Sequence, residues 1–342
     1  MSVADFRSDT LTAPGTQMRE AMAAAVVGDD VFGEDPTVNE LEGAAARFLG
    51  QEAALFVPSG TMANQIATHV HCRPGDELIC EERSHIYLYE GAGVTRWSGT
   101  SLRLLHAESG FPEPDDIRAA ARADDPHCPR SRLLVLENTH NMAGGRVLAP
   151  EGMRTRIAAA RDLGLAVHVD GARLANAAVA SKCTAAELVT GVDSVSLCFS
   201  KGLGAPVGSV LAGSTEFIYE ARRVRKALGG GMRQAGILAA AALMALRDGP
   251  ARLAVDHGRA RRVAQSLAPL PSIRLDLGAV ESNIVMVGLM GQAPGDLLGY
   301  LEARQIRAMS FGPTSVRLVF HCDLTEDDVD RCIEHITAWA NR

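Results

Sequence analysis

Two short apolar runs, one repeat apart, constrain the fold of this chain more than any other feature. Residues 195–199 are mainly apolar and are followed by Ser200 and Lys201, and residues 165–169 lead into Asp170. Each run has the length of a buried parallel strand, and the interval between them fits one strand–helix–strand unit. The pattern predicts an α/β domain in which Asp170 and Lys201 lie at the carboxyl edge of one sheet, where open sheets bind ligands.

Lys201 has the surroundings of a reactive lysine. Gly202, Gly204 and Gly208 follow it and leave room for a bulky group beside the backbone. A lysine that loses its hydration becomes a nucleophile for carbonyl groups, and a carboxylate such as Asp170 can hold a protonated pyridine nitrogen. Together the two residues indicate pyridoxal phosphate, whereas Lys201 alone is equally compatible with an ordinary turn lysine.

Further candidate residues lie at other turns and strands. Gly60 and Thr61 follow a predicted strand and begin a predicted helix, so their N–H groups form either an anion site or an ordinary helix cap. His85 follows another predicted strand, where a catalytic and a structural role remain equally open. Arg317 lies inside an apolar strand pattern, where it either faces solvent or clamps a carboxylate.

Composition excludes several classes of protein. The 342 residues carry a formal net charge of −7 and no basic run, which argues against nucleic acid or an anionic membrane as the main partner. No apolar stretch is long enough to span a bilayer and the N-terminus lacks a signal-peptide pattern, so we expect a cytoplasmic protein. The seven cysteines are scattered, without a Cys-x-x-Cys pair, and we expect neither a disulfide framework nor a metal site.

The chain also contains a predicted domain boundary. Gly249 and Pro250 interrupt helix-forming sequence and separate a predicted helix at 234–248 from another at 251–267. We therefore expect an N-terminal arm and large domain at 1–249 and a small α+β domain at 250–342.

In combination, the motifs resemble those of the low-specificity L-threonine aldolases, which are fold-type I pyridoxal-phosphate enzymes of the β-eliminating lyase group. The resemblance covers nearly the whole chain and implies a mostly parallel central sheet flanked by helices, with a smaller α+β C-terminal domain. The segments that carry it are residues 7–10, 30–33, 58–64, 137–141, 168–173, 199–208 and 229–234.

The resemblance also implies roles for individual residues. Lys201 would form the Schiff base with the cofactor, Asp170 would pair with the pyridine nitrogen, and His85 would stack on the ring. The sites would be shared between subunits of a homotetramer. The remaining implied contacts are Gly60 and Thr61 to the phosphate, Arg173 to the pyridoxal hydroxyl, Ser8, Arg173 and Arg317 to the substrate carboxylate, His127 near the β-hydroxyl, and Lys226 and Arg233 to the phosphate of a neighbouring subunit.

The implied reaction is the reversible cleavage of L-threonine, L-allo-threonine and related β-hydroxy-α-amino acids to glycine and an aldehyde. His85 or His127, directly or through water, would remove the β-hydroxyl proton, and the sequence leaves that choice open. The alternative is β-elimination or transamination with the same cofactor. A carrier without turnover would need no carboxylate clamp, and a nicotinamide enzyme would need a G-x-G-x-x-G segment after its first strand, which is missing.

Overall fold

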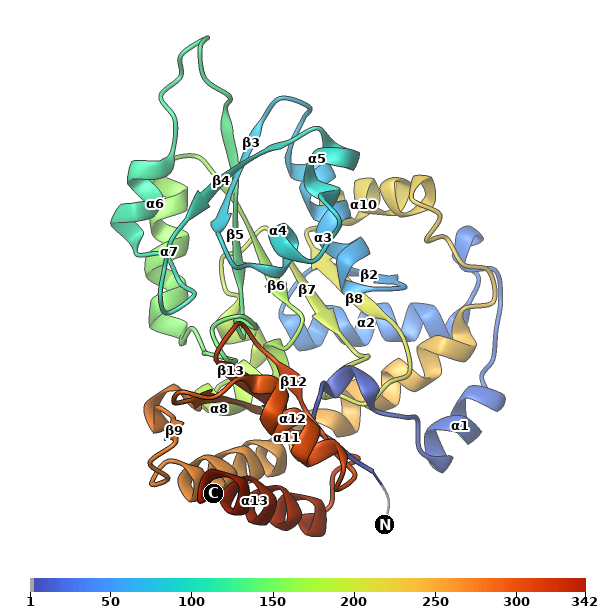
Figure 1. The fold of residues 1–342 in the computed structure, drawn as a ribbon. Coiled ribbons are helices and arrows are strands. Elements are labelled where there is room, and N and C mark those ends of the chain that lie inside the picture. Colours follow the sequence, from blue (N-terminus) through green and yellow to red (C-terminus); the bar gives the residue numbers. More distant parts are fainter. Residues whose placement is uncertain (1–2) are drawn as a thin grey trace.

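The computed structural model describes residues 3–342 and is built around a central sheet with the strand order β2-β8-β7-β6-β5-β3-β4 (Figure 1). The strands from β7 to β4 pair in parallel, and β8 is antiparallel to both of its neighbours. The predicted mostly parallel sheet is therefore confirmed. The strands are β2 (Ala53–Val57), β3 (Glu77–Glu81), β4 (Ser101–Leu105), β5 (Ser131–Glu137), β6 (Ala166–Gly171), β7 (Ser194–Cys198) and β8 (Ser209–Gly213).

Helices cover both faces of this sheet because successive strand residues point to opposite sides. In β2, Phe56 contributes to one apolar core and Leu55 to the other. The Phe56 side is covered by α2 (Pro36–Leu49), α6 (Pro114–Ala120), α7 (Pro150–Asp162), α8 (Leu174–Ser181), α9 (Ala185–Leu188) and α11 (Gly236–Leu267). The opposite side is covered by α3 (Gly60–His71), α4 (His85–Leu88), α5 (Gly93–Ser98) and α10 (Thr215–Ala227).

Helix α11 runs without interruption through the segment where the sequence predicted two helices, and Pro250 lies inside it. That part of the prediction is wrong. A proline costs the helix one hydrogen bond, but the buried faces of α11 pack along α2 and α8 and stabilise it as one unit. Gly249 allows close packing, because a Cβ there would lie 3.1 Å from the Leu203 Cα atom. The domain limits at 249 and 250 remain a prediction.

The C-terminal part forms the expected smaller α+β unit. Its antiparallel sheet has the order β12-β13-β10-β9. The strands are β9 (Ile273–Arg274), β10 (Ile284–Leu289), β12 (Met309–Ser310) and β13 (Ser315–Val319). The helices of this unit are α12 (Pro294–Glu302) and α13 (Glu326–Ala340). Short 3₁₀ helices are Asp9–Leu11, Asp30–Phe32 and Leu277–Ala279.

The N-terminal arm packs on this C-terminal unit. Its strand β1 (Ala4–Asp5) pairs in parallel with β11 (Ile306–Arg307), and the ring of Phe6 lies 5.3 Å from that of Phe320. Helix α1 (Thr16–Ala23) then contacts α11. The arm thus passes from one unit to the other, and residues directly after β1 reach the carboxyl edge of the central sheet. Among residues 3–342, no helix has both the length and the apolar composition needed to cross a membrane.

Candidate active site

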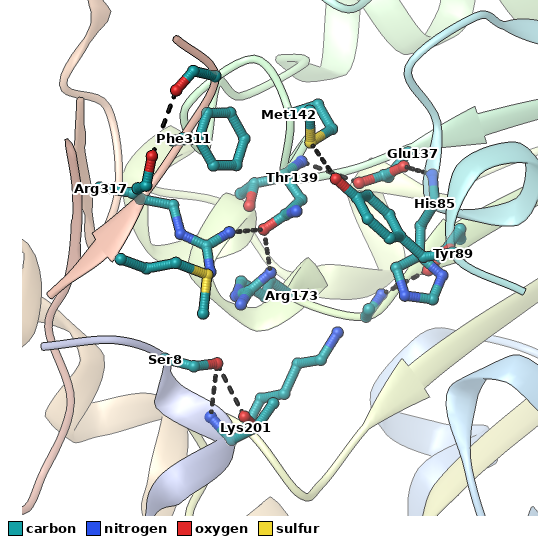
Figure 2. A pocket seen from close by; sticks show the side chains of 17 residues that line it. Ser8, His85, Tyr89, Glu137, Thr139, Met142, Arg173, Lys201, Phe311 and Arg317 are labelled. Carbon is teal, nitrogen blue, oxygen red and sulfur yellow. Dashed lines mark hydrogen bonds between the residues drawn. The ribbon is translucent and has the colours of Figure 1, made fainter. Parts of the chain in front are cut away.

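A pocket of about 370 Å³ lies at the carboxyl ends of the central strands (Figure 2). The strand ends contribute His85 after β3, Asp170 at the end of β6 and Lys201 after β7. The arm contributes Ser8, and the C-terminal sheet contributes Arg317 from β13. The structure therefore brings together residues that are far apart in the chain, at the edge where the sequence predicted a ligand site.

Lys201 presents an unpaired amine to this pocket. The chain contains three lysines, and both Lys182 and Lys226 are exposed and lie outside the pocket. The Lys201 carbonyl oxygen accepts a hydrogen bond from the Gly204 N–H (2.8 Å), which fixes the turn. Within residues 3–342, the amine itself has neither a hydrogen-bond nor an ion-pair partner, so it is available to a carbonyl compound.

Asp170 supplies a buried carboxylate on the same side of the pocket. Its Oδ2 accepts a hydrogen bond from the Asn64 side-chain amide (2.8 Å), and its Oδ1 accepts one from the Ala172 N–H (3.1 Å). Burial alone would raise the pKa of Asp170, but the charges of His85 and Lys201 and the Asn64 hydrogen bond hold it below its usual value. The carboxylate is therefore ionised at neutral pH and suits a protonated ring nitrogen.

His85 is held in place from both its backbone and its ring. Its backbone N–H donates to Oε2 of Glu137 at 2.7 Å, and its Nδ1 lies 2.9 Å from Oε1 of Glu90. The ring centroid is 5.7 Å from that of Tyr89. These contacts place an imidazole at the pocket wall, opposite the two arginines in Figure 2.

The two pocket arginines differ in what neutralises them. Asp9 accepts hydrogen bonds from Nε and Nη2 of Arg173 at 2.8 and 2.7 Å, which makes a buried, bidentate ion pair. Arg317 is only 7% exposed, and the part of the chain that the structure describes gives it no acidic partner. Its Nη1 donates to Oδ1 of Asn141 (3.0 Å), its Nη2 donates to the Arg7 carbonyl oxygen (3.2 Å), and its buried Nε has no partner among these residues.

An unpaired buried guanidinium is a strong site for an anion, because a carboxylate would restore the charge-assisted hydrogen bonds that burial removes. Ser8 lies in the same pocket and its Oγ accepts hydrogen bonds from the N–H and hydroxyl of Thr10 (3.2 and 2.8 Å), which leaves the Ser8 hydroxyl hydrogen free to donate. Arg317 and Ser8 together can therefore bind a carboxylate.

Gly60 and Thr61 form the first turn of α3, where Ser59 is the N-cap and its Oγ accepts from the Met62 N–H (3.2 Å). A Cβ on Gly60 would lie 2.7 Å from the Cys198 sulfur, so this close approach requires glycine. The N–H groups of a first helical turn have no intrahelical partner and suit a phosphate. Neither residue lines the pocket wall itself, but Asn64, one turn further along α3, reaches Asp170.

Besides Gly60 and Thr61, three further predicted site residues lie outside the pocket of this chain. The His127 side chain is 90% exposed on the loop before β5, where its Nδ1 lies 2.7 Å from an Asp125 oxygen. Lys226 lines a separate surface hollow on α10, and Arg233 donates from Nη1 to an Asp29 oxygen at 2.9 Å. The chain alone therefore does not bring these residues to Lys201, and their implied roles in an assembly of subunits remain predictions.

A model of the β-eliminating lyase family matches residues 5–289. The chain belongs to the β-eliminating lyase family. It is 43% identical to a probable low-specificity L-threonine aldolase of Arabidopsis thaliana, over 97% of this chain and 96% of the relative. It is 41% identical to a low-specificity L-threonine aldolase of Escherichia coli strain K12, over 99% of each chain. A solved structure of the threonine aldolase of Leishmania major has a TM-score of 0.84 at 21% identity, covering 98% of this chain and 99% of that one, which shows the fold.

The residues of the pocket fit pyridoxal phosphate, the cofactor expected for this member of the β-eliminating lyase family. Lys201 has an unpaired amine for the aldehyde, ionised Asp170 suits the pyridine nitrogen, and the first turn of α3 suits the phosphate. A high-resolution structure of SPT with PLP shares the fold of this chain, with a TM-score of 0.75 at 19% identity, over 99% of this chain and 86% of that one.

The sequence indicated no role for several residues that hold the pocket side chains in place. Glu137 and Asn141 lie within a segment that carried the resemblance. Their place at the end of β5 and just after it was the available signal, since β5 ends at the same sheet edge. Asn64 and Asp9 also lie within such segments, but the sequence does not pair them with Asp170 and Arg173, which are distant in the chain. Glu90 lies in none of these segments, and its spacing of five residues from His85 follows no regular helical or strand period.

Proposed function

We propose that this chain is a pyridoxal-phosphate-dependent aldolase that reversibly cleaves L-threonine, L-allo-threonine and related β-hydroxy-α-amino acids to glycine and an aldehyde. The observation that carries the proposal is that one pocket contains both the Lys201 amine and the buried Arg317 guanidinium, and neither has an acidic partner within residues 3–342. An amino acid has both of the groups that such a pair requires, an amine and an α-carboxylate. The relatives with 41–43% identity support the reaction and the substrate class.

Each pocket residue then has a defined task. Arg317, Ser8 and Arg173 orient the substrate carboxylate, and Asn141 holds both arginines by accepting a hydrogen bond from each (3.2 and 3.0 Å). Asp170 keeps the ring nitrogen protonated by remaining ionised. The bound cofactor supplies an electron-poor ring that accepts the electron pair of the broken Cα–Cβ bond.

A base must also remove the proton of the β-hydroxyl group. We assign this role to His85, because it lines the pocket that contains Lys201. His127 could act only if another subunit brought it there, since it is exposed and distant from the pocket of its own chain. Holding the proton acceptor and the carboxylate clamp on opposite walls would align the bond to be broken.

We further propose a cytoplasmic homotetramer with shared active sites, in which Lys226 and Arg233 bind the phosphate of a neighbouring subunit. Phe32 and Tyr219 are 73% and 65% exposed, and Tyr219 lines the same surface hollow as Lys226. Exposed aromatic side chains beside a cationic hollow are typical of an interface. All seven cysteines are free thiols, which supports a reducing compartment.

The proposed reaction is tested by identifying the products formed from L-threonine. An aldolase releases glycine and acetaldehyde in equal amounts, and D-threonine serves as the stereochemical control. The family name favours β-elimination as the second candidate, which would instead release ammonia and a keto acid. Ammonia and keto acid without glycine would overturn the proposal.

A further inference from the structure

Glu90 is a buried carboxylate just behind the pocket wall, and within residues 3–342 its side chain hydrogen-bonds to residues of α3 and to His85. Its Oε1 accepts from the Asn64 amide at 2.8 Å and lies 2.9 Å from Nδ1 of His85. Its Oε2 accepts from the Gln65 amide at 2.5 Å. Its side chain is fully shielded from solvent, and it does not line the pocket. Glu90 therefore cannot contact a substrate and can act only through its neighbours.

The Asn64 amide fixes the direction of these hydrogen bonds. Its two N–H groups point to carboxylate oxygens of Glu90 and Asp170, both at 2.8 Å. Its Oδ1 accordingly accepts, and it lies 3.1 Å from Nε2 of His168 and 3.3 Å from the Ser196 hydroxyl. A reversed amide would place its oxygen against two carboxylates, so both Glu90 and Asp170 must accept from it.

This arrangement determines the tautomer of His85. Burial raises the pKa of Glu90, but Asn64 and Gln65 direct N–H donors at its two oxygens, so the geometry is that of an accepting carboxylate. The hydrogen of the neutral imidazole therefore lies on Nδ1. The Nε2 atom then keeps its lone pair, and within residues 3–342 it has no hydrogen-bond partner. A carboxylate that orients a histidine in this way also stabilises the imidazolium formed when the ring accepts a proton.

We propose that Glu90 is a positioning residue for the reaction: it holds His85 with its hydrogen on Nδ1, so that Nε2 accepts the β-hydroxyl proton. The proposal rests on the proposed aldolase function. The O–H bond breaks as Nε2–H forms, the O–H electron pair becomes the second bond of the aldehyde carbonyl, and the Cα–Cβ pair remains with Cα. Cα then takes up one proton from solvent to give glycine, and His85 returns its proton to solvent before the next cycle, so the reaction releases no net proton.

Charges around the imidazole act in the same direction. Burial alone would lower the pKa of His85, but the Glu90 hydrogen bond and the charges of Asp170 and Glu90 raise it above its usual value, against a smaller opposing effect of Lys201. These are the charged groups that face the ring from the neighbouring elements. Removing the charge of Glu90 should therefore make His85 a weaker base.

The test is Glu90→Gln, which keeps the shape of the side chain and replaces one acceptor oxygen by a donor. The glutamine oxygen keeps the Oε1 position, because Asn64 donates to that atom, and the new amide group turns toward Gln65, whose own Oε1 has no partner within residues 3–342. His85 then keeps its hydrogen on Nδ1 but loses the charge that stabilises its imidazolium. We expect kcat for L-threonine to fall about 10- to 100-fold, less than the roughly 10²–10⁴-fold that a general base contributes, because His85 itself remains. KM and bound cofactor should change little. The acid limb of the kcat–pH profile should move to lower pH. Unchanged kcat with an unchanged acid limb would overturn the proposal.

A readout that does not depend on turnover separates this proposal from the aldolase function. Nitrogen NMR of the imidazoles in the cofactor-free protein should show neutral His85 protonated on Nδ1, and the His85 imidazolium should form at lower pH in Glu90→Gln than in the wild type. An Nε2–H tautomer in the wild type, or the same His85 titration in both proteins, would overturn the role of Glu90, whatever the reaction. Absence of aldehyde release by the wild type would instead overturn the aldolase function.

A matched control is available in Glu82, whose Oε1 lies 2.6 Å from Nδ1 of His106 in an exposed pair outside the pocket. Glu82→Gln should leave kcat and its pH profile unchanged. In a His85→Gln background, Glu90→Gln should cause no further loss of kcat, because the two residues act as one unit. A full additional loss in that background would contradict action through His85.

Discussion

At the scale of single residues, the site depends on two buried arginines with opposite environments. Arg173 is neutralised by Asp9, whereas Arg317 is held by neutral oxygens of Asn141 and Arg7. Burial and the charge of Arg173 both lower the pKa of Arg317, which means that the protein holds an unsatisfied positive charge there. An arriving carboxylate would relieve this cost, and we propose that this relief favours substrate binding.

We predict that Arg317→Gln raises KM for L-threonine about 10- to 100-fold, since a hydrogen bond to a charged group contributes roughly 1.5–3 kcal/mol. The visible absorbance of the bound cofactor should not change, because Arg317 is assigned to the substrate. Steady-state kinetics and cofactor titration measure the two quantities. Loss of the cofactor with an unchanged KM would show that Arg317 binds the cofactor and would contradict its assignment to the substrate.

We predict that Asp9 stabilises the fold in a pH-dependent way. Burial alone would raise the pKa of Asp9, but the charge and hydrogen bonds of Arg173 lower it well below its usual value. A lowered folded-state pKa stabilises the fold above the unfolded value of about 4, and that contribution is lost as pH falls below it.

Asp9→Asn should therefore lower the free energy of unfolding at pH 7 by about 3–5 kcal/mol, because it leaves Arg173 buried without a counter-charge. Urea unfolding of both proteins across pH measures the difference, which should shrink below about pH 4. A difference that stays constant with pH would contradict this role of the ion pair.

At the scale of elements, the turn that begins at Lys201 packs against helix α11. The strands that place Asp170 and Lys201 follow from their apolar runs, and the structure confirms both. The helix break expected at Gly249 and Pro250 was wrong, because local propensity gives no information about Leu203, which packs against Gly249 from a distant part of the chain.

We predict opposite effects of alanine at two glycines of α11. A Cβ added at Gly258 would meet no neighbouring atom within 4 Å, so Gly258→Ala should stabilise the protein by about 0.5–1 kcal/mol through helix propensity. Gly249→Ala should lose this gain and destabilise the protein, because its Cβ would press on Leu203 beside the lysine turn. Thermal unfolding compares them, and equal stabilisation by both changes would contradict the packing argument.

At the scale of the whole molecule, the sequence predicted the sheet, the small C-terminal unit and the residues at strand ends. It could not predict the partners that position them. The contacts of Asp9 with Arg173 and of Asn64 with Asp170 join side chains from distant parts of the chain, and only the folded chain brings them together. A single chain also leaves some predicted roles untested, because it does not bring three of the predicted residues to the pocket: His127, Lys226 and Arg233.

We predict that the active site needs two subunits. Chains carrying Lys201→Ala and chains carrying Lys226→Ala should each form impaired oligomers. Co-expression with two different tags should restore part of the activity in the mixed oligomers, because one of their sites then has both lysines intact. Doubly tagged oligomers without recovered activity would contradict a shared site.

The most direct test of the central claim compares the three lysines of the chain, Lys182, Lys201 and Lys226. The measurement is the release of glycine and acetaldehyde from L-threonine by the wild type, Lys201→Ala and the exposed control Lys182→Gln. We predict equal release by the wild type and the control, and none by Lys201→Ala. Aldehyde release that persists in Lys201→Ala would contradict the assignment of Lys201 as the lysine that binds the cofactor.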